Sequence, residues 1–147
     1  MRIVRVESAG CVAELVPVTA PSPSGVPMTL MQCLPKGRKI DLIVRQATEA
    51  GVARIVLVLS EHSQVRPDEK DGRMPRLRKI AREALQQSGT ARLPEIEEPR
   101  SLVSIAKSAE DWGTALFFHE RSLGGAALHQ LLAGTPRSVS ILSLIHI

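Results

Sequence analysis

Apolar and polar residues alternate at the start of the chain, in Ile3–Val6 and again in Cys11–Val16. A period of two is typical of a half-buried β-strand, and the short segment Glu7–Gly10 between the two runs predicts a hairpin turn. Because a two-stranded hairpin is only marginally stable in water, these strands need a partner sheet. Four prolines then fall within residues 17–27, which predicts a semi-rigid linker and a domain boundary.

The pattern changes after residue 28, where short apolar runs alternate with segments of helical periodicity. Apolar residues at positions 40, 43, 44 and 47 form the stripe of an amphipathic helix, and Gly51 is placed to end it. A second helix ends before Gly89, and Ser101 is a good N-cap for a third. The expected strands are 28–33, 53–59, 114–118 and 138–147, the expected helices are 38–50, 75–88, 102–109 and 123–132, and the segments 60–72 and 90–100 are expected to be loops. This alternation predicts an α/β fold with a parallel sheet and crossover helices.

Composition removes several function classes. The chain has 147 residues, of which 44% are apolar and 23% charged, as is typical of a globular protein. Only 2% are aromatic, which argues against an RNA-binding platform that stacks bases on surface rings. Two cysteines make neither a disulfide framework nor a zinc site. No apolar run is long enough to span a membrane and the start lacks a signal peptide, so we expect a soluble cytoplasmic protein without a metal.

The net charge of +4 is concentrated in one central segment. Residues 36–92 hold 13 Lys and Arg against seven Asp and Glu, which gives +6. Most of the basic residues are arginines, whose planar guanidinium suits phosphate. A basic patch that faces RNA is one explanation. The other is a solvated surface that only keeps the protein soluble.

Most enzyme signatures are missing. The sequence holds no glycine-rich phosphate loop, no nucleophile elbow around a serine, and no metal-ligand spacing among its four histidines. The residue pattern by itself therefore predicts only a basic α/β domain with RNA as a candidate partner.

A set of segments in register is more informative. They are Lys36–Val52, Ser60–Arg66, Arg78–Gly89, Arg92–Glu95 and the pair His119–Glu120. In order and spacing they resemble the RsmE family, the bacterial 16S ribosomal RNA uridine-N3 methyltransferases of the SPOUT superfamily. The resemblance covers residues 28–137 well and residues 1–27 loosely.

The resemblance implies an architecture. Members of the family join a PUA-like RNA-binding β-barrel to an α/β domain whose trefoil knot binds S-adenosylmethionine and forms a homodimer. Residues 1–16 then look like the last hairpin of the barrel, 17–27 like the linker, and 28–147 like the first part of the methyltransferase domain. The family's Gly-Pro-Glu-Gly-Gly and Leu-Arg-Thr-Glu-Thr loops do not occur in this sequence. We therefore expect a fragment, truncated at both ends, that does not methylate RNA alone.

The resemblance also implies catalytic residues. Arg45 and Glu49 share one helix face, and this helix faces the active cleft in the family; a surface ion pair is the alternative. Arg92 resembles the family's loop arginine near the target nucleotide, although Thr90 stands where the family usually has a basic residue. The uridine N3 proton must be removed during methyl transfer, and either Glu49 or Glu120 could be the base.

Cofactor and RNA contacts follow in the same way. His119 and Glu120 end a strand where the family has the first of three loops around the cofactor, with a plain turn as the alternative, and Leu142 is a further cofactor candidate. The candidate RNA-binding residues are Lys36, Arg38, Arg66, Arg78, Lys79 and Arg82, which on the alternative reading only form a solvated face. The implied partner is 16S ribosomal RNA in the small ribosomal subunit. A non-catalytic basic module that binds RNA or a protein, and a SPOUT enzyme that acts on transfer RNA, are the competing interpretations.

Overall fold

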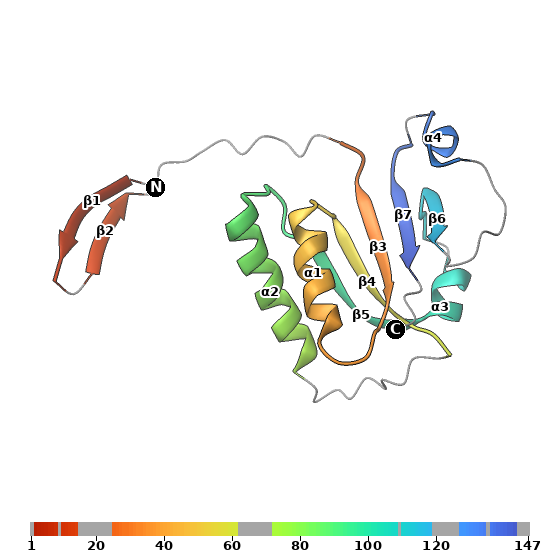
Figure 1. The fold of residues 1–147 in the computed structure, drawn as a ribbon, viewed down its shortest axis with the longest axis horizontal. Coiled ribbons are helices and arrows are strands. Elements are labelled where there is room, and N and C mark those ends of the chain that lie inside the picture. Colours follow the sequence, from red (N-terminus) through yellow and green to blue (C-terminus); the bar gives the residue numbers. More distant parts are fainter. Residues whose placement is uncertain are drawn as a thin grey trace.

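The computed structural model describes residues 2–8, 10–14, 25–61, 72–108, 110–118, 127–134 and 136–143 of the chain. Strands and helices alternate from Met28 onward (Figure 1), as the α/β prediction requires. The strands are β1 (Arg2–Glu7), β2 (Gly10–Glu14), β3 (Met28–Cys33), β4 (Arg54–Leu59), β5 (Glu95–Ser101), β6 (Thr114–Phe118) and β7 (Val139–Ser143). The helices are α1 (Lys39–Glu49), α2 (Arg73–Ser88), α3 (Leu102–Lys107) and α4 (Leu128–Leu131).

Five strands form one sheet in the order β5-β4-β3-β7-β6, and each neighbouring pair is parallel. The chain first adds β4 and β5 on one side of β3, and later adds β7 and β6 on the other side. Consecutive parallel strands need a crossover connection, which α1 and α2 supply between β3, β4 and β5. The predicted parallel sheet with crossover helices is confirmed.

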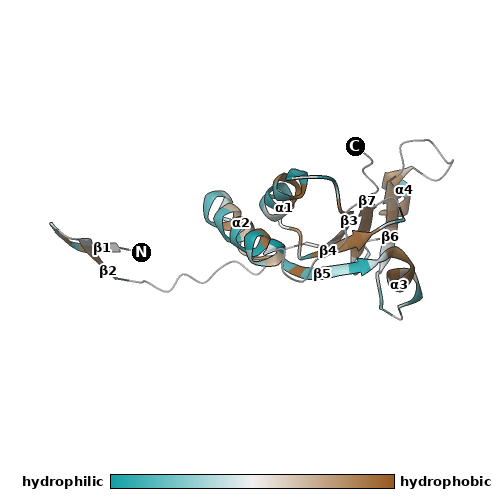
Figure 2. Ribbon diagram, turned by 90° about the horizontal axis from the view of Figure 1, so that it is seen from below, coloured by the Kyte–Doolittle hydropathy of each residue, from teal (hydrophilic) through white to brown (hydrophobic). Residues whose placement is uncertain are grey.

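The core has two layers, one on each face of the sheet. Helices α1 and α2 cover one face and α3 lies on the other (Figure 2). Because successive side chains of a strand point to opposite faces, Ile55 and Leu57 of β4 pack with α1 and α2, while Val56 and Val58 pack with Ile105 of α3. The four β4 side chains are completely buried, which explains why this strand reads as a continuous apolar run.

Capping residues and glycines in the sequence predict the ends of the helices closely. The first three helices begin and end within two residues of their predicted limits. Gly51 and Gly89 follow α1 and α2 with φ of +78° and +68°, a conformation that is costly for residues with a Cβ. Ser101 caps α3, and its side chain accepts a hydrogen bond from the Ser104 backbone N–H at 3.0 Å.

The prediction of a loop over residues 90–100 is wrong, because Glu95–Ser101 form β5 at the edge of the sheet beside β4. Ile96 is the one buried residue of this strand. An edge strand buries little surface, so its sequence lacks the apolar pattern by which strands are recognised, and an edge also tolerates Pro99.

The predicted hairpin is confirmed as an antiparallel pair of β1 and β2, which forms a sheet of its own. Val4, Val6 and Val12 are about half exposed or more on this hairpin, which fits the expectation that it needs a partner sheet. Residues 15–24 lie outside the described residues, so most of the proposed linker is not tested. The same applies to residues 119–126 and 144–147, which include parts of the predicted last helix and last strand.

Candidate functional site

The order of the strands marks one edge of the sheet for ligand binding. After β3 the chain turns first toward β5, and it later returns to the opposite side of β3 to place β7. In open parallel sheets, ligands bind at the carboxyl ends of the strands, at the point where the strand order reverses. Here that point lies between β3 and β7, beyond Cys33 and Ser143. We refer to this side of the sheet as the carboxyl edge and to the opposite side as the amino edge.

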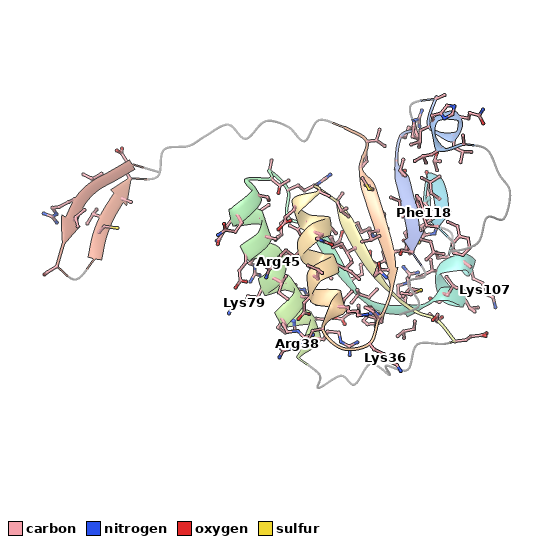
Figure 3. The ribbon with its side chains drawn as sticks, viewed as in Figure 1. Lys36, Arg38, Arg45, Lys79, Lys107 and Phe118 are labelled. Carbon is pink, nitrogen blue, oxygen red and sulfur yellow. The ribbon has the colours of Figure 1, made fainter. Side chains whose placement is uncertain are left out.

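Several basic residues lie at the carboxyl edge. Lys36 and Arg38 are exposed in the connection from β3 to α1 (Figure 3). Arg66 lies outside the described residues. Sequence reasoning missed Arg73 and Arg76, which stand in the first turn of α2 and line a cavity together with Arg38. A signal for them was present, because crossover helices of parallel strands begin at the carboxyl edge.

The basic residues of α2 divide into two groups. Arg76 faces α1, because its Nη2 lies 3.2 Å from Asp41 Oδ1. Arg78 faces β5, because its Nη2 lies 3.9 Å from Glu98 Oε1. Lys79 Nζ lies 3.9 Å from the Glu83 carboxylate one turn further along the same helix. Such long, exposed ion pairs contribute little to stability, so both cations can exchange these partners for phosphate.

Arg82, the third candidate RNA-binding residue of α2, is exposed. With Arg78 and Lys79 it forms the outer basic face of α2, which is distinct from the group around Arg38 and Arg76. The sequence predicted one basic surface, and the structure divides it between the carboxyl edge and the flank of α2 that faces β5.

Arg45 and Glu49 are exposed on the side of α1 opposite its buried stripe, which consists of Ile40, Val44, Ala47 and Thr48. No ion pair joins Arg45 to Glu49 within the described parts of the chain, so the surface ion pair considered from the sequence is not observed. Both side chains are therefore available to a ligand or a partner.

Glu49 and Arg92 lie near the amino edge. The Ala53 N–H donates to the Met28 carbonyl at 2.9 Å, so the segment after α1 is held at the start of β3. The Glu95 N–H donates to the Ala53 carbonyl at 3.0 Å, which holds the segment with exposed Arg92 beside it. By contrast, β6 ends at the carboxyl edge. His119 and Glu120, which follow β6 in the sequence, lie outside the described residues.

Leu142 occupies the penultimate position of β7, opposite Phe117 of β6. Its side chain is partly buried and packs against the core layer that includes Val58 and Ile105. Phe117 is 48% exposed. The carboxyl edge therefore offers apolar surface on two adjacent strands.

A charged network stabilises the face of the sheet that carries α3. Arg54 Nη2 lies 2.8 Å from Glu110 Oε2, Arg100 Nη1 lies 2.6 Å from Glu110 Oε1, and Arg54 Nε pairs with Glu97. The Arg54 guanidinium carbon also stands 5.0 Å from the centre of the Trp112 ring. Hydrogen bonds from Arg100 and Arg54 lower the pKa of the Glu110 carboxyl. This network joins β4 and β5 to the connection before β6, and we assign it a structural role.

Within the described ranges, no three His, Cys, Asp or Glu side chains gather closely enough to hold a metal ion. None of the helices in the same ranges has the length and apolar character required to cross a membrane.

Comparison with known proteins identifies relatives. A profile described as an RNA methyltransferase domain matches residues 22–143. Ribosomal RNA small subunit methyltransferase E of Bacillus subtilis is 27% identical over 114 residues, which cover 74% of this chain and 44% of the relative. Ribosomal RNA small subunit methyltransferase E 2 of Borreliella burgdorferi is 41% identical over 63 residues, which cover 42% of this chain and 26% of the relative.

The fold has solved counterparts. The ribosomal RNA small subunit methyltransferase E of Neisseria gonorrhoeae, solved with S-adenosyl methionine bound, matches with a TM-score of 0.71 and 22% identity, covering 85% of this chain and 52% of that chain. With respect to the two curated relatives, the present chain spans less than half of their length. The family profile and the two curated relatives confirm the resemblance to the RsmE family that the sequence motifs predicted, and the solved structure confirms the fold.

Proposed function

This chain belongs to the RNA methyltransferase domain family, and we propose that its protein transfers a methyl group from S-adenosylmethionine to N3 of a uridine in 16S ribosomal RNA. The observation that carries this proposal is the family match over residues 22–143, which spans the five-stranded sheet. Basic residues at the ligand-binding edge of that sheet support an RNA substrate. The proposed substrate belongs to the small ribosomal subunit, which implies a cytoplasmic protein.

The carboxyl edge suits the cofactor. A nucleoside base needs apolar surface, and Leu142 and half-exposed Phe117 provide it on adjacent strands. When bound there, S-adenosylmethionine would supply an electrophilic methyl group on its sulfonium. We propose that Leu142 contacts this group and that His119 and Glu120, next in sequence after β6, complete its site.

The target nitrogen needs a base. N3 of uridine carries a proton at neutral pH, and base pairing hides this edge, so the uridine must be unpaired or flipped out. Glu49 stands at the far end of α1, an 11-residue helix about 16 Å long, near the amino edge. Glu120 follows β6, which ends at the carboxyl edge. We therefore propose Glu120 as the base within one chain, while Glu49, Arg45 and Arg92 would reach the substrate only across a homodimer.

The hairpin and the basic residues would position the RNA. In this proposal β1 and β2 belong to a PUA-like barrel, whose remaining strands would cover the exposed valines. Residues 17–27 would link that barrel to the methyltransferase domain. Lys36, Arg38 and the outer basic face of α2 would hold phosphates, which fixes the register of the RNA without reading its sequence.

The test compares two proteins from one gene. We expect the 147-residue chain alone to transfer no methyl group, and the gene product extended to the length of its curated relatives to label small subunits with tritiated S-adenosylmethionine. Digestion and mass spectrometry should identify 3-methyluridine in 16S RNA. Label in transfer RNA would favour the competing SPOUT assignment. A gene whose reading frame stops directly after residue 147, with a product that binds RNA but transfers no methyl group, would favour a non-catalytic module. The basic charge of the chain is the observation that supports this alternative.

Within that assay, Glu120→Gln should reduce methyl transfer by about a hundredfold or more, as is typical of losing a general base. Glu49→Gln should not cause the same loss unless a second copy completes the site. If Glu49→Gln abolishes transfer in a monomeric enzyme while Glu120→Gln leaves it intact, our assignment of the base is wrong.

A further inference from the structure

A cavity of about 250 Å³ lies at the carboxyl edge between two segments that are far apart in the sequence. One wall is the connection from β3 to α1, which contributes Leu34, Gly37 and Arg38. The other wall is the first turn of α2, which contributes Arg73 and Arg76. Figure 3 shows Arg38 close to the ends at which α1 and α2 begin. The cavity is smaller than the roughly 300–1,000 Å³ typical of sites for drug-sized ligands.

Basic side chains line the cavity. Three arginines contribute to its walls, and the carboxylate of Asp41 lies beside one of them, with Oδ1 3.2 Å from Arg76 Nη2. Oδ1 is buried and accepts no hydrogen bond from the described residues. A guanidinium group carries five N–H donors, so the ion pair with Asp41 leaves Arg76 donors for another acceptor.

The backbone adds to this field. Helices α1 and α2 both begin beside the cavity, at Lys39 and Arg73. In the part of the chain that the structure describes, no side chain caps the first turn of either helix. The first N–H groups of a helix lack partners within the helix, and its N-terminus carries a partial positive charge. Two such ends beside three arginines favour a multiply charged anion.

We propose that this cavity binds one backbone phosphate of the RNA substrate. Guanidinium groups bind phosphate oxygens through paired, charge-assisted hydrogen bonds, and here they approach from two segments, as a tetrahedral group requires. Arg38 and Arg76 are the proposed ligands, and Arg73 lines the cavity beside them. The choice of RNA as the source of the phosphate rests on the proposed function, whereas the affinity for phosphate rests on the cavity alone. The contact would hold the RNA beside the carboxyl edge.

The first experiment uses the unaltered 147-residue chain and inorganic phosphate. Phosphate is titrated at constant ionic strength while backbone amide signals are followed by NMR. We expect saturable shifts confined to residues 37–40 and 72–76. Shifts that do not saturate, or that spread evenly over basic surfaces, would overturn the proposal without any variant.

The second experiment identifies the source of the phosphate. A labelled single-stranded RNA is titrated by fluorescence anisotropy with the unaltered chain, with the double variant Arg38→Gln and Arg76→Gln, and with Arg137→Gln as a control. Arg137 is exposed and does not line the cavity. The double variant should bind phosphate and RNA about tenfold more weakly or worse, because charge-assisted hydrogen bonds are lost. The control should behave like the unaltered chain, and thermal unfolding verifies that each variant is folded.

The outcomes separate the two proposals. Inorganic phosphate should compete with the RNA for the unaltered chain. If phosphate binds in the cavity without competing with RNA, and RNA binding is unaffected by the loss of Arg38 and Arg76, the cavity is a site for free phosphate and our proposal is wrong. If the cavity binds RNA phosphate but the extended protein transfers no methyl group, the proposed function fails and the cavity assignment stands.

Discussion

The outer basic face of α2 allows a quantitative prediction about RNA binding. The double variant Arg78→Ala and Arg82→Ala removes two exposed guanidinium groups from one helix. Alanine is the best helix former, and the ion pair lost with Arg78 spans 3.9 Å at an exposed site, so the cost to folding should be below about 1 kcal/mol. A change in RNA binding would therefore report the loss of phosphate contacts rather than of structure.

The magnitude follows from counterion release. Each phosphate that a protein neutralises on a single strand contributes about −0.7 to the slope of log affinity against log salt concentration. Losing two contacts should make that slope shallower by about 1.4. Between 50 and 200 mM salt, the unaltered chain should therefore lose about sevenfold more affinity than the variant does.

The assay is fluorescence anisotropy with a labelled single-stranded RNA at four salt concentrations. The matched control is Lys107→Ala with Arg137→Ala, which removes two exposed cations located away from α2. The control slope should equal that of the unaltered chain. An unchanged slope in the α2 variant, or an equal change in the control, would refute the assignment of this face to RNA.

Three further predictions concern folding and reactivity. Leu77→Ala should lower the free energy of unfolding by about 2–5 kcal/mol, because the Leu77 side chain is completely buried between α2 and the sheet. Urea titration measures this loss, and a clearly smaller value would contradict the burial of Leu77. Hydrogen bonds from Arg100 and Arg54 lower the pKa of Glu110 in the folded state, so the stability that Glu110 contributes is present at neutral pH and is lost as the pH falls through that lowered pKa. The difference in unfolding free energy between the unaltered chain and Glu110→Gln should therefore shrink on acidification below about pH 4.3, and a constant difference would contradict this. Burial raises the pKa of the Cys33 thiol while Cys11 is exposed, so a thiol reagent should modify one cysteine rapidly in the native chain and two after denaturation, whereas two rapid reactions would disprove the burial of Cys33.

The fold could be predicted where burial leaves a regular pattern. Strands β3 and β4 lie inside the sheet with neighbours on both sides, and their apolar runs at residues 28–33 and 54–59 identified them as strands. Gly51 and Gly89 marked helix ends because their backbone φ is positive. The strand Glu95–Ser101 was missed because an edge strand with one buried residue carries almost no hydrophobic signal. Recognising it requires knowing that β4 has an unpaired edge there, which is a property of the assembled sheet.

The position of Glu49 could have been deduced from the sequence. In a chain of alternating strands and helices, each crossover helix begins at the carboxyl edge and ends at the amino edge. A residue at the end of α1 must then lie far from the strand ends at which ligands bind, whatever face it shares with Arg45. Helical spacing gave the face of the helix but not the distance to the site, and these two properties have to be considered together.

The convergence of Arg38 with Arg76 depends on more than periodicity. Helix α1, strand β4 and the start of α2 separate these two residues in the sequence. They meet because β4 and β5 extend the sheet in the same direction, which places α1 and α2 side by side on one face. Arg78, only two residues after Arg76, points toward β5 instead. The helical repeat predicts that these two arginines face different directions, but only the strand order determines which of them reaches the carboxyl edge. Sequence can therefore identify the basic helix, whereas the division of its arginines between a cavity and an open surface follows from the topology of the sheet.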